Sequence, residues 1–349
     1  MLKAKGFGVE TQGETFKPLK IERREVGDND VMIQILYCGI CHSDVHQVRN
    51  DWGGSSYPIV PGHEIVGKIT AVGKNSRDLK VGDYVGVGCM VDSCGECQSC
   101  KSGYEQQCDK ETVWTYNSMD PITGKTTFGG YSDIITVNSR FVIKIGTDKD
   151  LAGLAPILCA GVTTYSPLKK FGAGPGKQVA VVGLGGLGHM AVKLARAMGA
   201  EVTVLTSSES KQDDAIRLGA SRSIVYHSKD DIRKSGYSFD IIVDTIPANH
   251  DINALISTLK PNGTLVLVGL PERSVKYSLS PPILMDSNRV IAGSNIGGIP
   301  ETQAVIDYCV KNNIRSDIEL ISFSYLDKAY ERIMKNDVKY RFVIDNSTI

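Results

Sequence analysis

A glycine-rich turn between an apolar run and a helical pattern constrains the fold of this chain most strongly. Residues 179–182 (VAVV) predict a buried strand, and residues 183–188 (GLGGLG) then match G-x-G-x-x-G. At such a turn the first glycine permits a tight bend, the second a close approach to a diphosphate, and the third close helix–strand packing. The helix N-terminus adds free amides and a positive dipole end. A turn that merely closes a βα unit is the other interpretation; the context favours a cofactor site at Gly183, Gly185, Gly186, Leu187 and Gly188.

Strands and helices alternate around this turn. The pattern predicts strands at 179–182, 202–206, 223–226, 240–245, 264–268 and 289–294, and helices at 187–198, 211–218 and 252–259. Such alternation implies right-handed βαβ units and a parallel sheet covered on both faces. Six strands fit one doubly wound nucleotide-binding sheet, so the fold class is α/β with a Rossmann domain.

The rest of the chain has a different texture. Before about residue 150 short strand-like runs at 31–37, 65–72 and 84–87 are separated by glycine turns, which predicts an irregular, mostly β domain. The tail has helices at 301–311 and 325–335 and a strand-like run at 340–344, and it does not continue the alternation. We therefore expect residues 1–155 and 297–349 to form one domain and residues 156–296 the nucleotide-binding domain.

Composition excludes several classes of protein. Among 349 residues Lys+Arg and Asp+Glu both number 39, which disfavours nucleic acid or an anionic membrane as the main partner. No apolar run is long enough to span a bilayer, and the start MLKAKGFGVE has no apolar signal segment. We therefore expect a cytoplasmic protein, and because its nine cysteines are also an odd number, a disulfide framework is a poor interpretation.

Four of the cysteines lie in one short stretch, at Cys94, Cys97, Cys100 and Cys108. Cysteines separated by two residues can direct both sulfur atoms to one ion, and four thiolates complete a tetrahedral shell. The spacing therefore predicts a structural zinc site. An iron–sulfur cluster is the competing interpretation. The absence of a proline after the last cysteine makes it the weaker one.

A second possible metal site is dispersed along the chain. Cys41 opens the polar run 41–46 (CHSDVH), His63 lies beside an acid between two glycines, and Cys159 directly precedes the nucleotide-binding pattern. Three protein ligands with a position left for water are typical of catalytic zinc. Taken singly, Cys159 would be a small core residue and His63 a loop histidine. The remaining thiols, Cys38, Cys89 and Cys309, are expected in the core.

The end of the second strand of the nucleotide-binding domain indicates which dinucleotide binds. Sites for NAD usually have Asp or Glu there, and this chain has Ser207 followed by Ser208 and Lys211. Hydroxyls and a lysine suit a 2′-phosphate. Glu209 argues the other way, and an ordinary polar turn with a helix cap is the alternative.

These motifs together resemble the zinc-dependent medium-chain alcohol dehydrogenases. The segment 62–76 is similar to the family's zinc signature, and the cysteine loop and the GLGGLG turn follow in the same order. The resemblance covers essentially the whole chain and is nearest to the cinnamyl-alcohol-dehydrogenase-like branch, which includes bacterial broad-range aldehyde reductases. It is carried by residues 41–46, 158–167, 207–208, 296–302 and 339–345. It implies a GroES-like catalytic domain and a dimer or tetramer, of which we expect a homodimer.

The resemblance implies roles for individual residues. Cys41, His63 and Cys159 would hold the catalytic zinc, Asp44 would orient His63, and Glu64 would lie behind the metal. Ser43 would bond the substrate oxygen, and His46 would pass the proton to solvent. His42 and Arg341 would reach the diphosphate. The remaining implied contacts are Thr163, Val268, Gly269, Leu270, Ser294 and Ile296 with the nicotinamide and its ribose, and Trp52 and Trp114 with the substrate. Surface-loop anchors are the alternative interpretation of both tryptophans.

The sequence thus predicts an NADP(H)- and zinc-dependent alcohol dehydrogenase, with two zinc ions per chain, that acts mainly as a reductase of aromatic or medium-chain aldehydes. Two alternatives remain open at this point. An NAD-dependent zinc dehydrogenase of the polyol type would favour an acid where Ser207 stands. A zinc- or nucleotide-sensing module without catalysis would not need Ser43 and His46 beside Cys41.

Overall fold

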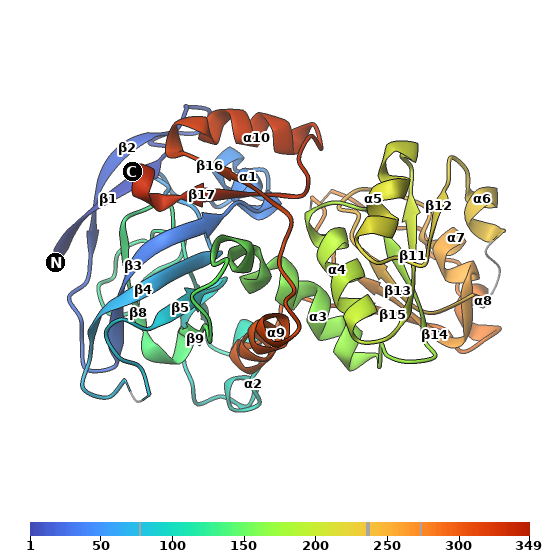
Figure 1. The fold of residues 1–349 in the computed structure, drawn as a ribbon, viewed down its shortest axis with the longest axis horizontal. Coiled ribbons are helices and arrows are strands. Elements are labelled where there is room, and N and C mark those ends of the chain that lie inside the picture. The colour runs from blue at the N-terminus through green and yellow to red at the C-terminus, as the bar shows by residue number, and fades with distance from the viewer. Residues whose placement is uncertain (77, 235–237, 273) are drawn as a thin grey trace. The chain divides into compact units, whose positions relative to one another are not determined.

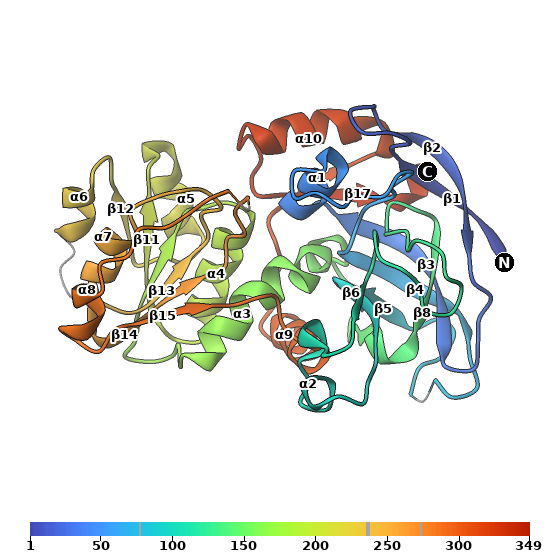
Figure 2. The same cartoon turned by 180° about the vertical axis from the view of Figure 1, so that it is seen from behind.

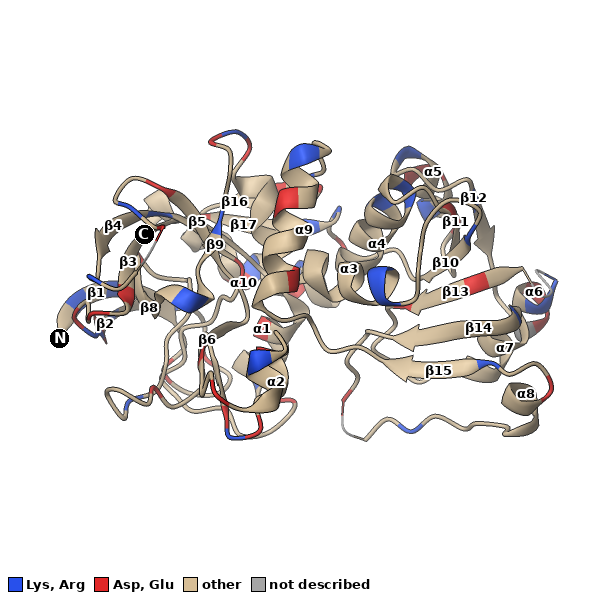
Figure 3. Ribbon diagram, turned by 90° about the horizontal axis from the view of Figure 1, so that it is seen from below, with Lys and Arg blue, Asp and Glu red and all other residues tan. Residues whose placement is uncertain are grey.

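The computed structural model describes residues 1–76, 78–234, 238–272 and 274–349. The chain divides into two compact units, residues 1–159 with 297–349 and residues 160–296 (Figure 1). The tail therefore belongs to the same unit as the N-terminal half. Among the described residues, no helix is both long and apolar enough to cross a membrane. Basic and acidic residues are interspersed along both units (Figure 3).

The first unit is built on a seven-stranded sheet of order β16-β17-β3-β4-β5-β9, in which β8 also pairs with β3. The long strand β3 is central because Val31, Ile33 and Ile35 are buried between its neighbours. The hairpins β1–β2 and β6–β7 lie outside this sheet. The strands are β1 Leu2–Gly8, β2 Lys17–Arg23, β3 Asp30–Gly39, β4 Ile65–Val72, β5 Tyr84–Val87, β6 Met90–Ser93, β7 Thr112–Trp114, β8 Ile134–Asn138, β9 Ile143–Lys144, β16 Ile318–Ile321 and β17 Arg341–Asp345.

Short helices connect these strands. The α-helices are α1 His42–Arg49, α2 Gln98–Lys101, α9 Ile299–Lys311 and α10 Leu326–Met334. The 3₁₀ turns are η1 Glu105–Gln107, η2 Ser139–Phe141, η3 Ala152–Leu158, η5 Phe323–Tyr325 and η6 Asn346–Thr348. Helix α1 begins directly after β3, where Asp44 accepts the Cys41 N–H at 2.8 Å, and it ends at Asn50 in the left-handed region (φ 61°).

The second unit is a six-stranded parallel sheet of order β12-β11-β10-β13-β14-β15, which confirms the doubly wound prediction (Figure 2). Its strands are β10 Gln178–Val182, β11 Glu201–Thr206, β12 Arg222–Val225, β13 Phe239–Asp244, β14 Leu259–Leu267 and β15 Val290–Gly293. Its helices are α3 Ala160–Lys170, α4 Gly186–Ala197, η4 Glu209–Lys211, α5 Gln212–Arg217, α6 Lys229–Arg233, α7 Ile252–Ser257 and α8 Pro282–Met285.

Packing on both faces holds this sheet. Helix α4 packs on α3, and α7 packs on α6 and α8. The core between β13, β14 and α7 is apolar, with Phe239, Ile242, Leu255 and Leu265 at most 1% exposed. This burial is the main stabilising term for such a unit, at roughly 1.5–3 kcal/mol per fully buried large side chain.

Several elements of the second unit differ from the sequence prediction, which did not include helices α3, α6 and α8 and which placed the start of β14 too late. Helix α3 was not expected, because it contains Pro167, and a proline in a sequence argues against a helix interior. Strand β14 begins at Leu259, although the pattern placed that residue at the end of the preceding helix. Leu259 pairs with Phe239, and a register shift follows before the regular ladder. Asn262 has positive φ (63°) within that irregular stretch.

Candidate functional site

The glycine turn has the geometry that its pattern predicts. Gly183 lies in the left-handed region (φ 85°), where other residues are strained. A Cβ at Gly188 would meet the Gly183 carbonyl oxygen at 2.0 Å, so α4 approaches β10 as closely as a glycine permits. A Cβ at Gly185 would point into open space, which leaves room above the turn. Gly186 and Leu187 form the first turn of α4, so the amides there can bind a diphosphate.

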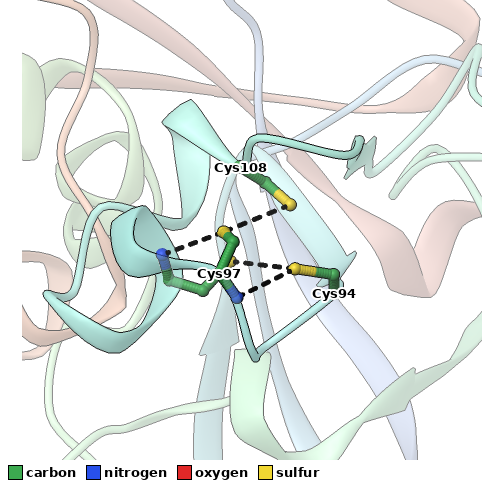
Figure 4. A group of neighbouring side chains, drawn as sticks. Cys94, Cys97 and Cys108 are labelled. Atoms are coloured by element: carbon green, nitrogen blue, oxygen red, sulfur yellow. Dashed lines mark hydrogen bonds between the residues drawn. The ribbon is translucent and has the colours of Figure 1, made fainter.

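The four-cysteine loop forms a compact sulfur cluster (Figure 4). The sulfur atoms lie within 4.8 Å of one another, with 3.9 Å between Cys94 and Cys100 and 4.0 Å between Cys97 and Cys108. A tetrahedron with zinc–sulfur bonds of about 2.3 Å has edges of about 3.8 Å. An iron–sulfur cluster would hold the same thiolates farther apart, around several iron atoms. The sulfur positions therefore fit one zinc ion.

Backbone amides support the thiolate form of this cluster. The Cys97 N–H donates to Cys94 Sγ at 3.4 Å and the Cys100 N–H to Cys97 Sγ at 3.5 Å. Hydrogen bonds from the backbone at Asp109 and Cys100 lower the pKa of Cys97. Because metal ligands must be deprotonated, these bonds favour metal binding over free thiols.

The second candidate metal site is assembled from segments far apart in the sequence. One ligand atom each of Cys41, His63, Glu64 and Cys159 lies within 4.8 Å of the others, and all four residues are buried. Cys41 Sγ and Cys159 Sγ are 4.0 Å apart. Turn η3, which packs on β3, β4 and β17, brings Cys159 to this place. The structure thus brings together the ligands that the resemblance implies, and the sulfur–sulfur distance again fits zinc.

The Asp44 carboxylate holds the residues of this site in position through hydrogen bonds. Its Oδ1 accepts the Gly62 N–H at 3.1 Å and lies 3.1 Å from His63 Nδ1, and its Oδ2 accepts the Cys41 N–H. His63 Nε2 is therefore the nitrogen that faces the thiols. Burial by itself would lower the pKa of His63, but the charges of Asp44 and Cys89 and the hydrogen bonds to Asp44 and Cys41 together raise this pKa. Tyr131 adds a long contact of 3.5 Å to Asp44 Oδ2.

Glu64 and Arg341 form a fully buried ion pair at the same site. Arg341 Nη2 donates to Glu64 Oε1, although the two residues are 277 positions apart. The other carboxylate oxygen, Oε2, is buried without a hydrogen-bond partner. Burial, which the Arg341 charge only partly offsets, raises the pKa of Glu64 to about 8. The sequence did not reveal this contact, because it assigned Arg341 to the diphosphate alone.

Helix α1 places a polar row, formed by Ser43 and His46, beside Cys41. Ser43 Oγ lies 3.7 Å from Cys41 Sγ. One turn on, His46 Nδ1 lies 2.9 Å from Asp51 Oδ2, and the rings of His46 and Trp52 are 4.9 Å apart. Trp52 Nε1 is buried and has no hydrogen-bond partner. Asp51 was not identified from the sequence, since nothing in its spacing distinguishes it from other loop acids.

Cys89 is not the core residue that the sequence predicted. It is only half-buried, whereas Cys38 and Cys309 are fully buried as expected. Its thiol hydrogen-bonds with Cys159, and this bond lowers the pKa of Cys89. Cys89 therefore lies beside the candidate metal site. Its apolar sequence context concealed this position.

Ser207 lines a cavity of about 340 Å³ at the carboxyl end of the parallel sheet. Ser208 follows in the same turn, where its Oγ lies 2.8 Å from Ser210 Oγ, and Lys211 ends η4. Glu209, which follows Ser208 in this turn, is exposed. The other lining residues are Tyr226, His227, Ser228, Ile232, His250, Asp251 and Leu255.

The remaining predicted residues vary in exposure. Thr163 is buried in α3, and Val268 is buried where β14 ends. Gly269, Ser294 and Ile296 are half-buried, and Ile296 has positive φ (43°), an unusual conformation for a β-branched residue. His42, Leu270 and Trp114 are exposed, the last two by 62% and 38%. The main chain of Trp114 bonds to Ser118 and Thr127.

Comparison with known proteins identifies the family. Residues 27–147 match the family described as Alcohol dehydrogenase GroES-like domain, and residues 186–311 match Zinc-binding dehydrogenase. The chain is 49% identical to Aldehyde reductase YahK of Escherichia coli over 351 residues, which cover 100% of this chain and 99% of that protein. The chain belongs to the zinc-binding alcohol dehydrogenase family. The resemblance and the fold class expected from the sequence are thereby confirmed.

Further relatives agree in sequence and in structure. NADP-dependent alcohol dehydrogenase C 1 of Mycolicibacterium smegmatis is 48% identical over 344 residues, covering 98% of each chain. A cinnamyl alcohol dehydrogenase of Sorghum bicolor superposes with a TM-score of 0.95 at 43% identity, over 99% of this chain and 98% of its own. The crystal structure of CAD from Helicobacter pylori complexed with NADP(H) superposes with a TM-score of 0.93 at 43% identity, covering 99% of each chain.

Proposed function

We propose that this protein is an NADP(H)- and zinc-dependent oxidoreductase that interconverts aldehydes and primary alcohols and mainly reduces aromatic or medium-chain aldehydes. The observation that carries the proposal is the buried set Cys41, His63, Glu64 and Cys159, with the polar row of α1 next to it. Relatives of nearly equal length include an aldehyde reductase and NADP-dependent alcohol dehydrogenases. Their names support both the reaction and the cofactor.

Each residue of the site has a separate role in the proposed reaction. Cys41, His63 and Cys159 would hold a zinc ion, which would supply Lewis-acid polarisation of the substrate oxygen, with the hydride coming from bound NADPH. Ser43, which neighbours Cys41, holds the substrate oxygen through its hydroxyl. His46 delivers the proton that the product alcohol needs.

Asp51 has a supporting part in proton delivery. Its carboxylate holds His46 Nδ1 at 2.9 Å, which fixes the ring with Nε2 as the exchanging nitrogen. His46 is only half-buried, so it connects the buried site with solvent. Trp52 packs on the His46 ring and would form one wall for the substrate, as the sequence predicts.

Ser207, Ser208 and Lys211 are proposed to hold the 2′-phosphate of NADP(H). Ser207 stands where NAD sites usually have an acid, which supports this choice over NAD. The amides of Gly186 and Leu187 would bind the diphosphate, which His42 and Arg341 would also reach. Thr163, Val268, Gly269, Leu270, Ser294 and Ile296 would contact the nicotinamide and its ribose.

A direct assay tests the function. Purified protein with NADPH and benzaldehyde should consume NADPH, and kcat/KM with NADPH should exceed that with NADH. Consumption of NADH with a polyol–ketose pair in preference would support the polyol-type alternative instead. Failure to turn over any aldehyde with either cofactor, in protein that contains zinc, would support a sensing module and refute the proposal.

The domain roles follow from the same assignment. We propose that residues 1–155 and 297–349 form the zinc-binding catalytic domain, and that residues 156–296 form the dinucleotide-binding domain. Limited proteolysis tests the boundary, since bound NADPH should protect the second segment. The nine free cysteines support a cytoplasmic location, because thiolate metal ligands need a reducing compartment.

We also propose that the protein is a homodimer. Strand β15 is an edge strand of the six-stranded sheet, and its residue Val290 is 44% exposed. Met285, five residues earlier, is 76% exposed. An apolar strand edge of this kind is suited to pairing with a second copy. Light scattering should give twice the 37.8 kDa chain mass, and Val290→Lys should weaken the dimer; a wild-type monomer would refute the proposal.

A further inference from the structure

The loop that follows β13 is closed by a histidine–aspartate contact. His250 Nε2 lies 2.7 Å from Asp244 Oδ2, and His250 Nδ1 lies 2.8 Å from the Ala248 carbonyl oxygen. The side chain of Asp244 is 1% exposed and that of His250 is 16% exposed. The contact therefore joins the last residue of β13 to the end of the loop 245–250.

The two oxygen partners determine the charge of the His250 ring. A carbonyl oxygen can only accept a hydrogen bond, so Nδ1 must carry a hydrogen. The carboxylate of Asp244 accepts as well, because its Oδ1 takes the Ile246 N–H at 3.1 Å while Oδ2 faces the ring. Both ring nitrogens therefore donate, and the ring is an imidazolium paired with a buried carboxylate.

The groups around the ring favour this cation. Burial lowers the pKa of His250, but the hydrogen bonds to Asp244 and Ala248 and the charges of Asp244 and Asp251 together raise it above its ordinary value. The rings of Tyr277 and His250 contact each other with 5.4 Å between their centroids and 77° between their planes.

The other titratable groups here come from the neighbouring segments. Tyr226 after β12 and Tyr277 before α8 both have raised pKa values, through burial and the negative charge of Asp244. Both phenols therefore stay neutral where the histidine titrates. His227 lines the same cavity and is exposed. Asp244 and Asp251 are thus the negative partners that favour the His250 cation.

The loop touches each part of the proposed dinucleotide site in this unit. Thr245 Oγ1 donates to the carbonyl of Val182, directly before the glycine turn, at 2.7 Å. On the other side the Asp244 carbonyl accepts the N–H groups of Val268 and Gly269 at 2.9 and 3.1 Å. A Cβ at Gly269 would meet loop backbone at 2.7 Å. At the end of the loop, His250 lines the same cavity as Ser207.

We propose that protonated His250 is a positioning residue that clasps the loop 245–250 against Asp244 and thereby sets the affinity for the dinucleotide. The inference rests on the proposed cofactor site and adds that pH controls the affinity of this site for the dinucleotide. The clasp is closed while the ring is charged. Because the folded-state pKa is raised, the clasp is complete below the ordinary histidine range and is lost as pH rises through the raised value. Dinucleotide affinity should fall over that rise.

The test is the dissociation constant of NADPH and of NADH from pH 6 to 9, measured by fluorescence titration. NADH separates the clasp from the 2′-phosphate, which itself ionises near pH 6. For wild-type protein we expect the NADH dissociation constant to rise about tenfold with pH, the range of one charge-assisted hydrogen bond. His250→Gln cannot titrate, so it should bind both ligands about tenfold more weakly at pH 6 and without that pH dependence.

His227→Gln is the matched control, because it removes the other histidine of the cavity wall and should keep the wild-type pH dependence. Equal profiles for His250→Gln and wild type, or loss of the dependence in His227→Gln, would overturn the clasp. If His250→Gln does not fold, nitrogen-15 NMR of wild-type histidines decides: a neutral His250 ring at pH 7 overturns the inference, and a doubly protonated ring supports it. Wild-type protein that binds no NADPH would refute the cofactor site itself.

Discussion

Replacement of Asp44 by Asn tests how the buried carboxylate organises the zinc ligands. In the structure its two oxygens receive three nitrogen contacts, from Cys41 N, Gly62 N and His63 Nδ1, at 2.8–3.1 Å. An Asn side chain has one acceptor oxygen, so its amide group must face at least one of these N–H donors. A buried donor without a partner costs about 1–3 kcal/mol, and the charge that strengthens the His63 bond is lost as well.

We therefore expect Asp44→Asn to lower the free energy of unfolding by about 2–4 kcal/mol and zinc affinity at the Cys41 site by about 10–100-fold. Denaturant titration measures the first and competition with a chromogenic chelator the second. Asp51→Asn is the control: this carboxylate lies nearby but contacts His46, so zinc affinity should be unchanged. Zinc affinity within twofold of wild type in Asp44→Asn would refute the reasoning.

Three further substitutions test separate parts of the account. Cys97→Ser should release the structural zinc and lower the melting temperature, because such a site contributes folding energy directly; an unchanged melting temperature would contradict it. His46→Ala should slow turnover by about 10²-fold near neutral pH with zinc still bound, and an unchanged pH–rate profile would exclude the relay. Ser207→Asp should reverse or flatten the NADPH preference in kcat/KM through lost phosphate bonds and new repulsion; a retained preference would place the 2′-phosphate elsewhere.

Local patterns in this sequence predicted most of the fold. The GLGGLG turn and the alternation around it depend on neighbours within about 30 residues, and they predicted the parallel sheet. The four cysteines of the structural site span 15 positions, so their spacing alone brought the sulfurs together. Helix α3 was missed because Pro167 conceals its pattern, and tertiary packing overrides that local signal.

The catalytic site depends on contacts that spacing cannot supply. Cys41 and Cys159 are 118 positions apart and Glu64 and Arg341 are 277 apart, so the resemblance, and not periodicity, connected the zinc ligands. Cys89 was misassigned because an apolar context says nothing about which thiol faces a site. Asp51 was missed because a loop, without a regular period, carries its carboxylate to His46.

The most direct test of the central claim is zinc content and NADPH-driven benzaldehyde reduction measured on one sample of Cys159→Ser. Cys159 belongs to the catalytic ligand set and not to the four-cysteine loop. The account predicts two zinc ions per wild-type chain, and for the variant a folded protein with one zinc ion that binds NADPH but does not reduce the aldehyde. A variant that retains wild-type turnover, or a fully active wild type with one zinc ion or fewer, would contradict it.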